Sequence, residues 1–303
     1  MASQREVRTR IASFRNIQKI TRAMEAVSAA RLRRAEQRIA ALRPYADALR
    51  RMTRQAARDA GAEASRLPLL AQREQEQNVG LLIVTADRGL AGAFNSQIIR
   101  SGLRAASELE AGGQRTVWFA SGRRGVSSLV FRGRTLAGSY TGFTDRPSYA
   151  DARRISDDLV AGFIDGSLDR VEVIYNGYIS PLTQRVTRET LLPIAEATVL
   201  GEEEAAEEED EDRDGAPRPL VEYEPEAEEL LRVLLPDYVE ISLYRALLES
   251  TASEHGARMT AMRSASENAG ELIEDLALEM NRARQAEITQ EIMEVVAGAE
   301  SLV

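Results

Sequence analysis

The chain has 303 residues and a formal net charge of −9, and its 44% hydrophobic and 29% charged residues are typical of a protein that buries a core. It contains no cysteine and a single histidine, His255, which excludes disulfides, thiolate metal sites and a cysteine nucleophile. A single histidine also makes a histidine-based metal site or a Ser–His–Asp triad improbable. No apolar stretch approaches the roughly 20 residues needed to cross a bilayer. These absences argue against most enzyme mechanisms and against a metal site built from cysteine or histidine.

The net charge conceals a strong asymmetry along the chain. Residues 1–60 hold fourteen arginines and Lys19 against five acids, a net charge of +10. Residues 201–229 hold fifteen acids against two arginines, a net charge of −13. Like-charge repulsion and three prolines predict that 201–229 is a disordered, solvated insertion. A regulatory contact between this insertion and basic neighbours is the alternative.

Residues 1–60 predict one long amphipathic helix. Residues with high helix propensity dominate the segment, Pro44 is its only proline, and Gly61 and Pro68 mark its end. At 1.5 Å per residue the helix would be roughly 85 Å long, more than a domain of this size could enclose. Apolar residues recur at spacings of three and four, at Val7, Ile11, Phe14, Ile17, Ile20, Met24 and Val27.

Residues 230–303 predict a second long helix with a heptad seam. The seam residues are Met259, Met262, Ser266, Ala269, Ile273, Leu276, Met280 and Ala283. Beyond Ala283 the seam slips by one residue, and the apolar positions continue at Ile288, Ile292, Val295 and Ala299. Two long helices at opposite ends of one chain predict a single antiparallel coiled coil, so that 1–60 and 230–303 form one discontinuous domain.

Residues 77–200 predict a small Rossmann-like α/β domain. Strands alternate with helices, which indicates a mostly parallel sheet covered on both faces. The expected strands are 80–85, 116–120, 171–179 and an antiparallel edge strand at 184–192, and the expected helices are 94–110 and 148–164.

Three features allow a functional and a structural interpretation. The segment Asp87–Phe94 follows the first strand and resembles a phosphate-binding turn, but it lacks both G-x-G-x-x-G and a Walker lysine, so a structural strand-to-helix turn is favoured. His255 has no second ligand on its helix, which favours packing over metal binding. The arginines of 1–60 could bind nucleic acid, although no aromatic residues are interleaved with them.

Two positions on the long helices are candidates for contact with another protein. Met24 lies on the first helix, where core packing is the usual explanation. Arg284, Gln285 and Thr289 fall where the heptad phase slips. Such a polar cluster is either a solvated face or a contact with an enclosing partner, and the pattern by itself leaves both open.

Several motifs resemble the gamma subunit of F-type ATP synthases. Arg15-Asn-Ile-Gln-Lys-Ile-Thr-Arg-Ala-Met24 is similar to the opening signature of that family, and Asp87-Arg-Gly-Leu-Ala-Gly92 is similar to its central turn. Asn281-Arg-Ala-Arg-Gln-Ala286 and Ile288-Thr-Gln-Glu-Ile292 resemble its C-terminal helix. The resemblance covers almost the whole chain except the acidic insertion. Lysine is common in the family where Arg22 and Arg31 stand here, which keeps the charge.

The resemblance implies a protein that catalyses nothing itself. In this family the terminal helices form a coiled coil inside a ring of alternating alpha and beta subunits, and the α/β domain contacts the epsilon subunit and the membrane rotor ring (the c-ring). The chain would then be the central rotor shaft of a proton-translocating ATP synthase, with no cofactor and no nucleic acid. A peripheral position on the cytoplasmic face of a bacterial membrane is expected, because no transit peptide precedes the first motif.

The resemblance also implies roles for individual residues. Met24, Arg284, Gln285 and Thr289 match positions that contact loops of the beta subunits. Arg15, Arg22 and Arg31 would supply positive charge near them, and Ile288, Ile292, Val295 and Val296 would form an apolar tip that turns in a bearing. The main alternative function is a free-standing coiled-coil scaffold or a nucleic-acid-binding protein. A nucleotide-dependent enzyme is a weaker alternative.

Overall fold

The computed structural model describes residues 4–73, 75–194 and 226–300. Internal contacts divide the chain into two compact units, each described here by itself. Unit 1 comprises Met1–Ala30 and Arg258–Val303, and unit 2 comprises Arg31–Ala257. Two long helices, α1 (Gln4–Ala60) and α7 (Ala227–Glu300), contribute residues to both units. A short 3-10 helix, η1 (Gly61–Arg66), follows α1.

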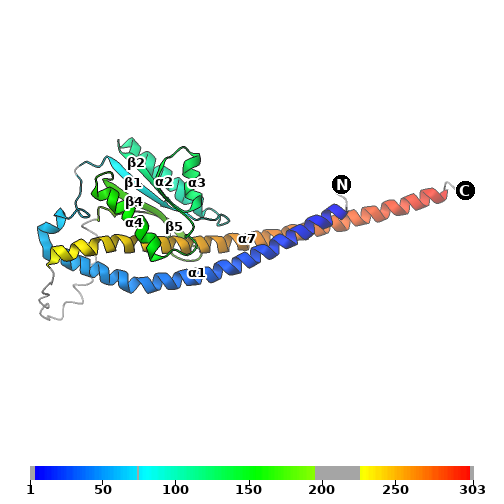
Figure 1. The fold of residues 1–303 in the computed structure, drawn as a ribbon. Helices are drawn as coiled ribbons and strands as arrows, with labels where there is room; N and C mark the ends of the chain where they lie inside the picture. The colour runs from blue at the N-terminus through cyan, green and yellow to red at the C-terminus, as the bar shows by residue number, and fades with distance from the viewer. Residues whose placement is uncertain (1–3, 74, 195–225, 301–303) are drawn as a thin grey trace. The chain divides into compact units, whose positions relative to one another are not determined.

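Unit 2 contains a five-stranded sheet in the order β3-β2-β1-β4-β5 (Figure 1). Strands β1 to β4 run parallel, and β5 pairs antiparallel with β4 at the edge, as the sequence predicts. The strands are β1 (Asn78–Val84), β2 (Arg115–Ser121), β3 (Leu136–Tyr140), β4 (Arg170–Tyr178) and β5 (Gln184–Leu192).

Helices cover both faces of this sheet because its central strands are apolar on both sides. Leu81 and Ile83 of β1 pack with α2 (Phe94–Ala111) and α3 (Arg123–Phe131). Leu82 and Val84, which alternate with them, pack on the opposite face with α4 (Tyr149–Ile164) and with the unit-2 parts of α1 and α7. The mixed α/β fold predicted from the sequence is confirmed.

Besides the 3-10 helix η1, one strand and one α-helix of unit 2 are not predicted by the sequence patterns. Strand β3 has the sequence Leu-Ala-Gly-Ser-Tyr and lies at the sheet edge, with only Tyr140 buried. Helix α3 is nine residues long and includes Gly125. Neither segment carries a long apolar period, so local pattern alone could not separate them from loop. By contrast, α4 begins at a capping box formed by Ser148 and Asp151, close to its predicted start.

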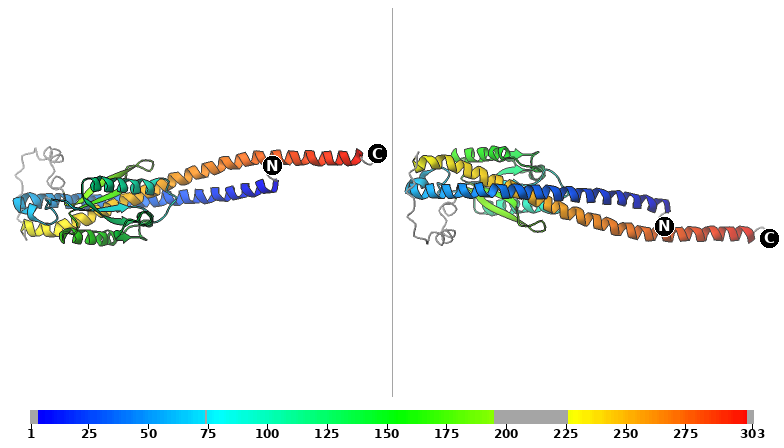
Figure 2. Two further views of the ribbon diagram at one scale, coloured as in Figure 1. Left: turned by 90° about the horizontal axis from the view of Figure 1, so that it is seen from above. Right: turned by 90° about the horizontal axis from the view of Figure 1, so that it is seen from below.

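In unit 1 the part of α1 from residue 4 to residue 30 packs antiparallel against the part of α7 from residue 258 to about residue 283. Gln18 Nε2 donates to the carbonyl of Ser266, and Arg263 Nε lies 2.9 Å from Glu25 Oε1, so residue numbers rise along one helix as they fall along the other. Views from above and below show that α7 continues past the start of α1 (Figure 2). The acidic segment predicted for 201–229 lies outside the described residues through position 225, and α7 begins at Ala227.

Candidate protein-contact surface

The paired helices of unit 1 share a narrow seam. On α7 every predicted seam residue from Met259 to Ala283 is buried or half-buried, and Met262, Ser266 and Ala269 are the most enclosed. Small residues allow the helices to approach closely. A Cβ added to Gly270 would lie 3.1 Å from Nε2 of Gln18 on α1. The heptad pattern on α7 therefore predicted its packing face correctly.

The predicted apolar stripe on α1 is wrong in its middle part. Ile17, Ile20 and Val27 are 45%, 59% and 51% exposed. The seam instead follows a strict heptad through more polar positions, at Val7, Ile11, Phe14, Gln18, Thr21, Glu25 and Ser28.

These polar seam positions are tolerated because their side chains are hydrogen-bonded, Gln18 and Glu25 to α7 and the other two within α1. The hydroxyl of Thr21 donates to the carbonyl of Gln18, and that of Ser28 donates to the carbonyl of Met24 at 2.7 Å. The consequence is an apolar stripe of Ile17, Ile20 and Val27 on the outside of the helix pair.

The C-terminal turns of α7 have no helix beside them in the described part of unit 1. All described side chains from Arg284 to Ala297 are exposed, including those of the predicted apolar tip, Ile288, Ile292, Val295 and Val296. Arg284, Gln285 and Thr289 are exposed as well, and the Thr289 hydroxyl donates to the Gln285 carbonyl at 2.9 Å. At 100° per residue, these seven side chains fall within an arc of about 140°. The structure thus brings the predicted polar cluster and the predicted tip onto one mixed face of α7.

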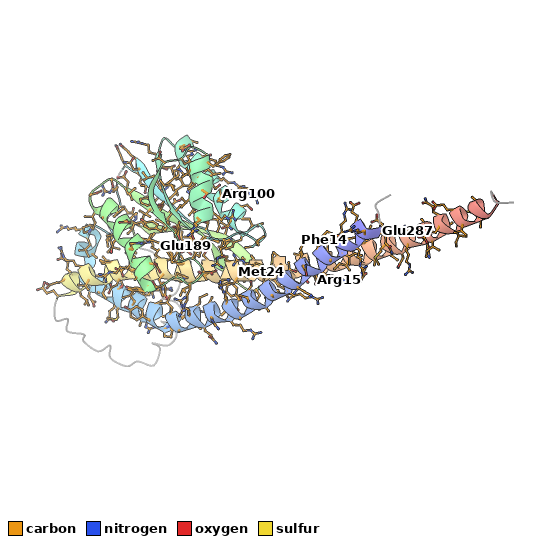
Figure 3. The ribbon with its side chains drawn as sticks, turned by 45° about the vertical axis from the view of Figure 1, so that its right-hand side comes forward. Phe14, Arg15, Met24, Arg100, Glu189 and Glu287 are labelled. Carbon is orange, nitrogen blue, oxygen red and sulfur yellow. The ribbon has the colours of Figure 1, made fainter. Side chains whose placement is uncertain are left out.

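Met24 lies on a separate surface from this face. It is half-buried beside Glu25, which pairs with Arg263 of α7. Arg284 follows Arg263 by 21 residues, or about 30 Å along the helix axis. Figure 3 labels Phe14, Arg15 and Met24 along α1 and Glu287 on the exposed end of α7.

The three arginines predicted to supply positive charge do not share one environment. Arg15 and Arg22 are exposed on the unit-1 part of α1. Arg31 belongs to unit 2 and forms an ion pair with Asp145, which follows β3. Burial raises the pKa of Asp145, but the hydrogen bond and charge of Arg31, together with the charge of Arg88, hold it below its usual value. No sequence pattern marks Asp145 as the partner of Arg31, because 114 residues separate them.

The turn after β1 is built as a structural joint. The carboxylate of Asp87 accepts hydrogen bonds from the backbone N–H groups of Arg123, Gly142 and Thr144. The side chain of Asn95 accepts from the N–H of Ala86. Backbone donors near the strand ends, which could otherwise hold a phosphate, are directed to an internal carboxylate.

Helix α7 covers the crevice where a doubly wound sheet would bind a ligand. In this strand order the switch point lies between β1 and β4. The hydroxyl of Ser250 lies 3.5 Å from the carbonyl of Val84 at the end of β1, and that of Ser253 donates to the carbonyl of Asn176 on β4 at 3.0 Å. The structural interpretation of the Asp87–Phe94 turn therefore has the better support.

His255 is a packed helix residue. It is almost fully buried, and its Nε2 lies 3.4 Å from the carbonyl oxygen of Asp145. Within the described ranges, no group of three or more His, Asp and Glu side chains could hold a metal ion. No helix in those ranges has both the length and the apolar character required to cross a membrane.

Paired terminal helices and a mostly parallel sheet whose ligand crevice is covered define an α/β protein with two long terminal helices. A family model described as "ATP synthase" matches residues 3–302. The ATP synthase gamma chain of Rubrobacter xylanophilus is 45% identical over 302 residues, covering 100% of this chain and 99% of the relative. That of Frankia casuarinae is 43% identical over 307 residues, with coverage of 100% and 99%. The chain belongs to the ATP synthase gamma-chain family.

Solved structures agree with this assignment. A chain of the mitochondrial ATP synthase central stalk and c-ring of Tetrahymena thermophila is 25% identical with a TM-score of 0.59, and the match covers 82% of this chain and 99% of that one. A chain from the Euglena gracilis mitochondrial ATP synthase has a TM-score of 0.66 at 18% identity, with coverage of 99% and 94%, which shows the shared fold.

Proposed function

We propose that the mixed face at the end of α7 is the surface through which this chain acts on the catalytic beta subunits of ATP synthase. As a member of the gamma-chain family, the chain is a non-catalytic subunit and the central rotor shaft of the enzyme. It transmits rotation between the membrane rotor ring and the catalytic subunits. It is a peripheral part of a membrane-associated complex, and we place it on the cytoplasmic face of a bacterial cell membrane.

The shaft works by differential binding. Each orientation of an off-centre shaft binds one arrangement of beta-subunit conformations better than the others, so rotation shifts the populations of those conformations. The shaft needs surfaces that distinguish the three beta subunits, and it needs no catalytic groups of its own. The shift can be no larger than the difference in contact free energy between orientations.

The observation that carries this proposal is the single arc of seven exposed side chains on α7. Arg284, Gln285 and Thr289 supply polar groups for a loop of one beta subunit. The neighbouring apolar side chains, Ile288, Ile292, Val295 and Val296, carry no charge and can turn against a bearing without fixed ion pairs. An apolar surface exposed over several turns of a helix favours an enclosing partner over open water.

The other proposed contacts use separate parts of the chain. Met24, with Arg15 and Arg22 exposed nearby in sequence, faces a second, acidic beta-subunit loop, and Arg31 adds positive charge. The alpha subunits complete the ring, while the α/β domain contacts the epsilon subunit and the c-ring. In this scheme 1–60 and 230–303 form the shaft, 77–200 forms the α/β domain, and 201–229 is an acidic insertion.

The test has two parts. Assembly with alpha and beta subunits scores complex formation and steady ATP hydrolysis, and the complete ATP synthase in membrane vesicles scores ATP synthesis driven by a proton gradient. Arg284→Ala combined with Gln285→Ala is expected to lower coupled synthesis several-fold, because polar contacts to the beta loop are lost. Gln290→Ala is the control, since this exposed side chain lies at least about 100° around the helix from every residue of the arc. Unchanged assembly and synthesis in the double variant would make the contact assignment wrong. A wild-type chain that stayed apart and bound RNA or itself would revive the scaffold alternative.

A further inference from the structure

The loop of residues 141–148, between β3 and α4, is bonded to three separate parts of unit 2. Its first attachment is to the turn after β1. The carboxylate of Asp87 accepts from the N–H groups of Gly142 and Thr144 at 2.8 and 3.2 Å. The hydroxyl of Thr144 donates to the same carboxylate at 3.0 Å and accepts from the N–H of Asp87 at 2.8 Å. One end of this loop, which we call the clasp loop, is therefore fixed to the sheet.

The second attachment is to α1. Arg31 forms an ion pair with Asp145, and Arg38 donates from its guanidinium to the carbonyl of Pro147. Arg38 also donates to the hydroxyl of Tyr244 on α7 at 2.9 Å. Arg88 places a second positive charge 3.6 Å from Asp145. Charge-assisted bonds of this kind are stronger and more directional than contacts between neutral groups.

The third attachment is to α7. The hydroxyl of Thr251 lies 3.0 Å from the carbonyl oxygen of Thr144 and 2.8 Å from that of Leu247, so its one proton is shared between the clasp loop and its own helix. Nε2 of His255 lies 3.4 Å from the carbonyl oxygen of Asp145. Thr144, Thr251 and His255 are all buried, so water does not compete freely for these groups.

The clasp loop acts at a particular place along both helices. Arg31 is the first residue of α1 that belongs to unit 2, and His255 lies two residues before Ala257, the last residue of α7 in unit 2. The loop thus holds each helix at the point where it passes out of the unit that contains the sheet. Apolar packing is non-directional and permits small sliding or rolling of a helix, whereas several hydrogen bonds from one loop to two helices oppose both motions.

We propose that the clasp loop is the torque-bearing joint between the α/β domain and the two shaft helices, with Asp145 as its positioning residue. The inference rests on the proposed rotor function. Rotation delivered to the α/β domain reaches α1 through Arg31 and Arg38, and reaches α7 through Thr251 and His255. If the bonds of the clasp loop were weakened, the helices would turn relative to the α/β domain when torque is applied. ATP would then be hydrolysed with fewer protons pumped for each ATP.

The experiment uses the complete ATP synthase containing this chain in inside-out membrane vesicles, with ATP hydrolysis and ATP-driven proton pumping measured on the same preparation. Asp145→Asn keeps the side-chain shape and removes its charge. We expect its ratio of pumping to hydrolysis to fall at least threefold, with a larger deficit against an opposing proton gradient. Asp145→Glu, which retains a carboxylate, should restore most of the ratio. Asp157→Asn, at an exposed position of α4, is the matched control for loss of one acidic charge and should leave the ratio unchanged.

The outcomes separate this inference from the simpler interpretations. A structural role alone would lower hydrolysis and pumping in proportion, which would overturn the proposal, as would an unchanged ratio in Asp145→Asn. If that variant does not assemble, Thr251→Val removes the hydroxyl shared between the carbonyls of Thr144 and Leu247, and the ratio of pumping to hydrolysis is measured in the same way. A wild-type chain that supports neither hydrolysis nor pumping would refute the rotor function itself, whereas a working wild type with unaffected variants refutes only the clasp.

Discussion

The seam of unit 1 can be tested with one substitution made at two positions of the same helix. Met262 lies in the seam of α7 and is 6% exposed, whereas Met293 lies on the same helix beyond the paired part and is 65% exposed. Burying a methionine side chain contributes about 1.5–3 kcal/mol. Because a two-helix seam lies near water and can partly collapse, we expect Met262→Ala to cost about 2 kcal/mol, at the low end for large-to-small changes. Met293→Ala should cost less than about 0.5 kcal/mol.

The appropriate assay is hydrogen exchange on the whole chain, read peptide by peptide. A loss of about 2 kcal/mol in the local opening free energy corresponds to roughly 30-fold faster exchange. For Met262→Ala the acceleration should appear in peptides covering 4–30 and 258–283 and should be absent from the sheet of unit 2. Equal effects of the two substitutions, or an equal acceleration in β1 and β4, would refute the reasoning that this seam holds unit 1 together.

Two further predictions concern unit 2. Gly122→Ala should cost about 3 kcal/mol or more in urea unfolding, because φ is +90° there and an added Cβ would lie 2.1 Å from the carbonyl oxygen of Thr85. Gly133→Ala, with φ of +71° and open space around it, should cost only about 1 kcal/mol, and equal losses would contradict this account. The Asp145–Arg31 ion pair is partly exposed and should contribute about 0.5–1 kcal/mol at neutral pH. Since the folded pKa of Asp145 is lowered, that contribution is present above the unfolded value of 3.8 and is lost as pH falls through the folded pKa. The difference in unfolding free energy between wild type and Asp145→Asn should therefore shrink below about pH 3.8, and a constant difference at pH 3 would argue against the pair.

The covered crevice explains how a Rossmann-like sheet serves a rotor-shaft subunit. In doubly wound proteins the strand ends at the switch point form the usual ligand site. Here Ser250 and Ser253 of α7 approach the carbonyls at the ends of β1 and β4, and Asp87 takes up the backbone donors of the adjoining loops. The strand ends and backbone donors that commonly bind a nucleotide here bind α7 and Asp87. The sheet therefore anchors a helix of the shaft instead of a ligand.

Much of the architecture could be predicted from local sequence patterns. Local patterns predict the two long helices, the seam of α7 and four of the five strands. These patterns are apolar periodicity, helix and strand propensity, and the positions of glycine and proline, all of which act within a few residues. The resemblance of the terminal motifs identified the family, which the full-length relatives confirm. The roles of Met24, Arg284, Gln285 and Thr289 remain predictions, because they depend on partner chains.

Tertiary structure decided the features that depend on partners distant in sequence. Two overlapping stripes on α1 could have formed its seam, and the one through Gln18, Thr21 and Ser28 was selected because it matches the heptad of α7, which leaves Ile17 and Ile20 outside. The short strand β3 gains its hydrogen bonds only by pairing with β2. Arg31 and Asp145 form an ion pair although 114 residues separate them in the sequence, and no local pattern predicts such a contact. The sequence by itself determined the long helices and the apolar strands. Packing determined the short elements β3 and α3 and which faces, loops and charges meet, because those contacts depend on the free energy of the whole fold.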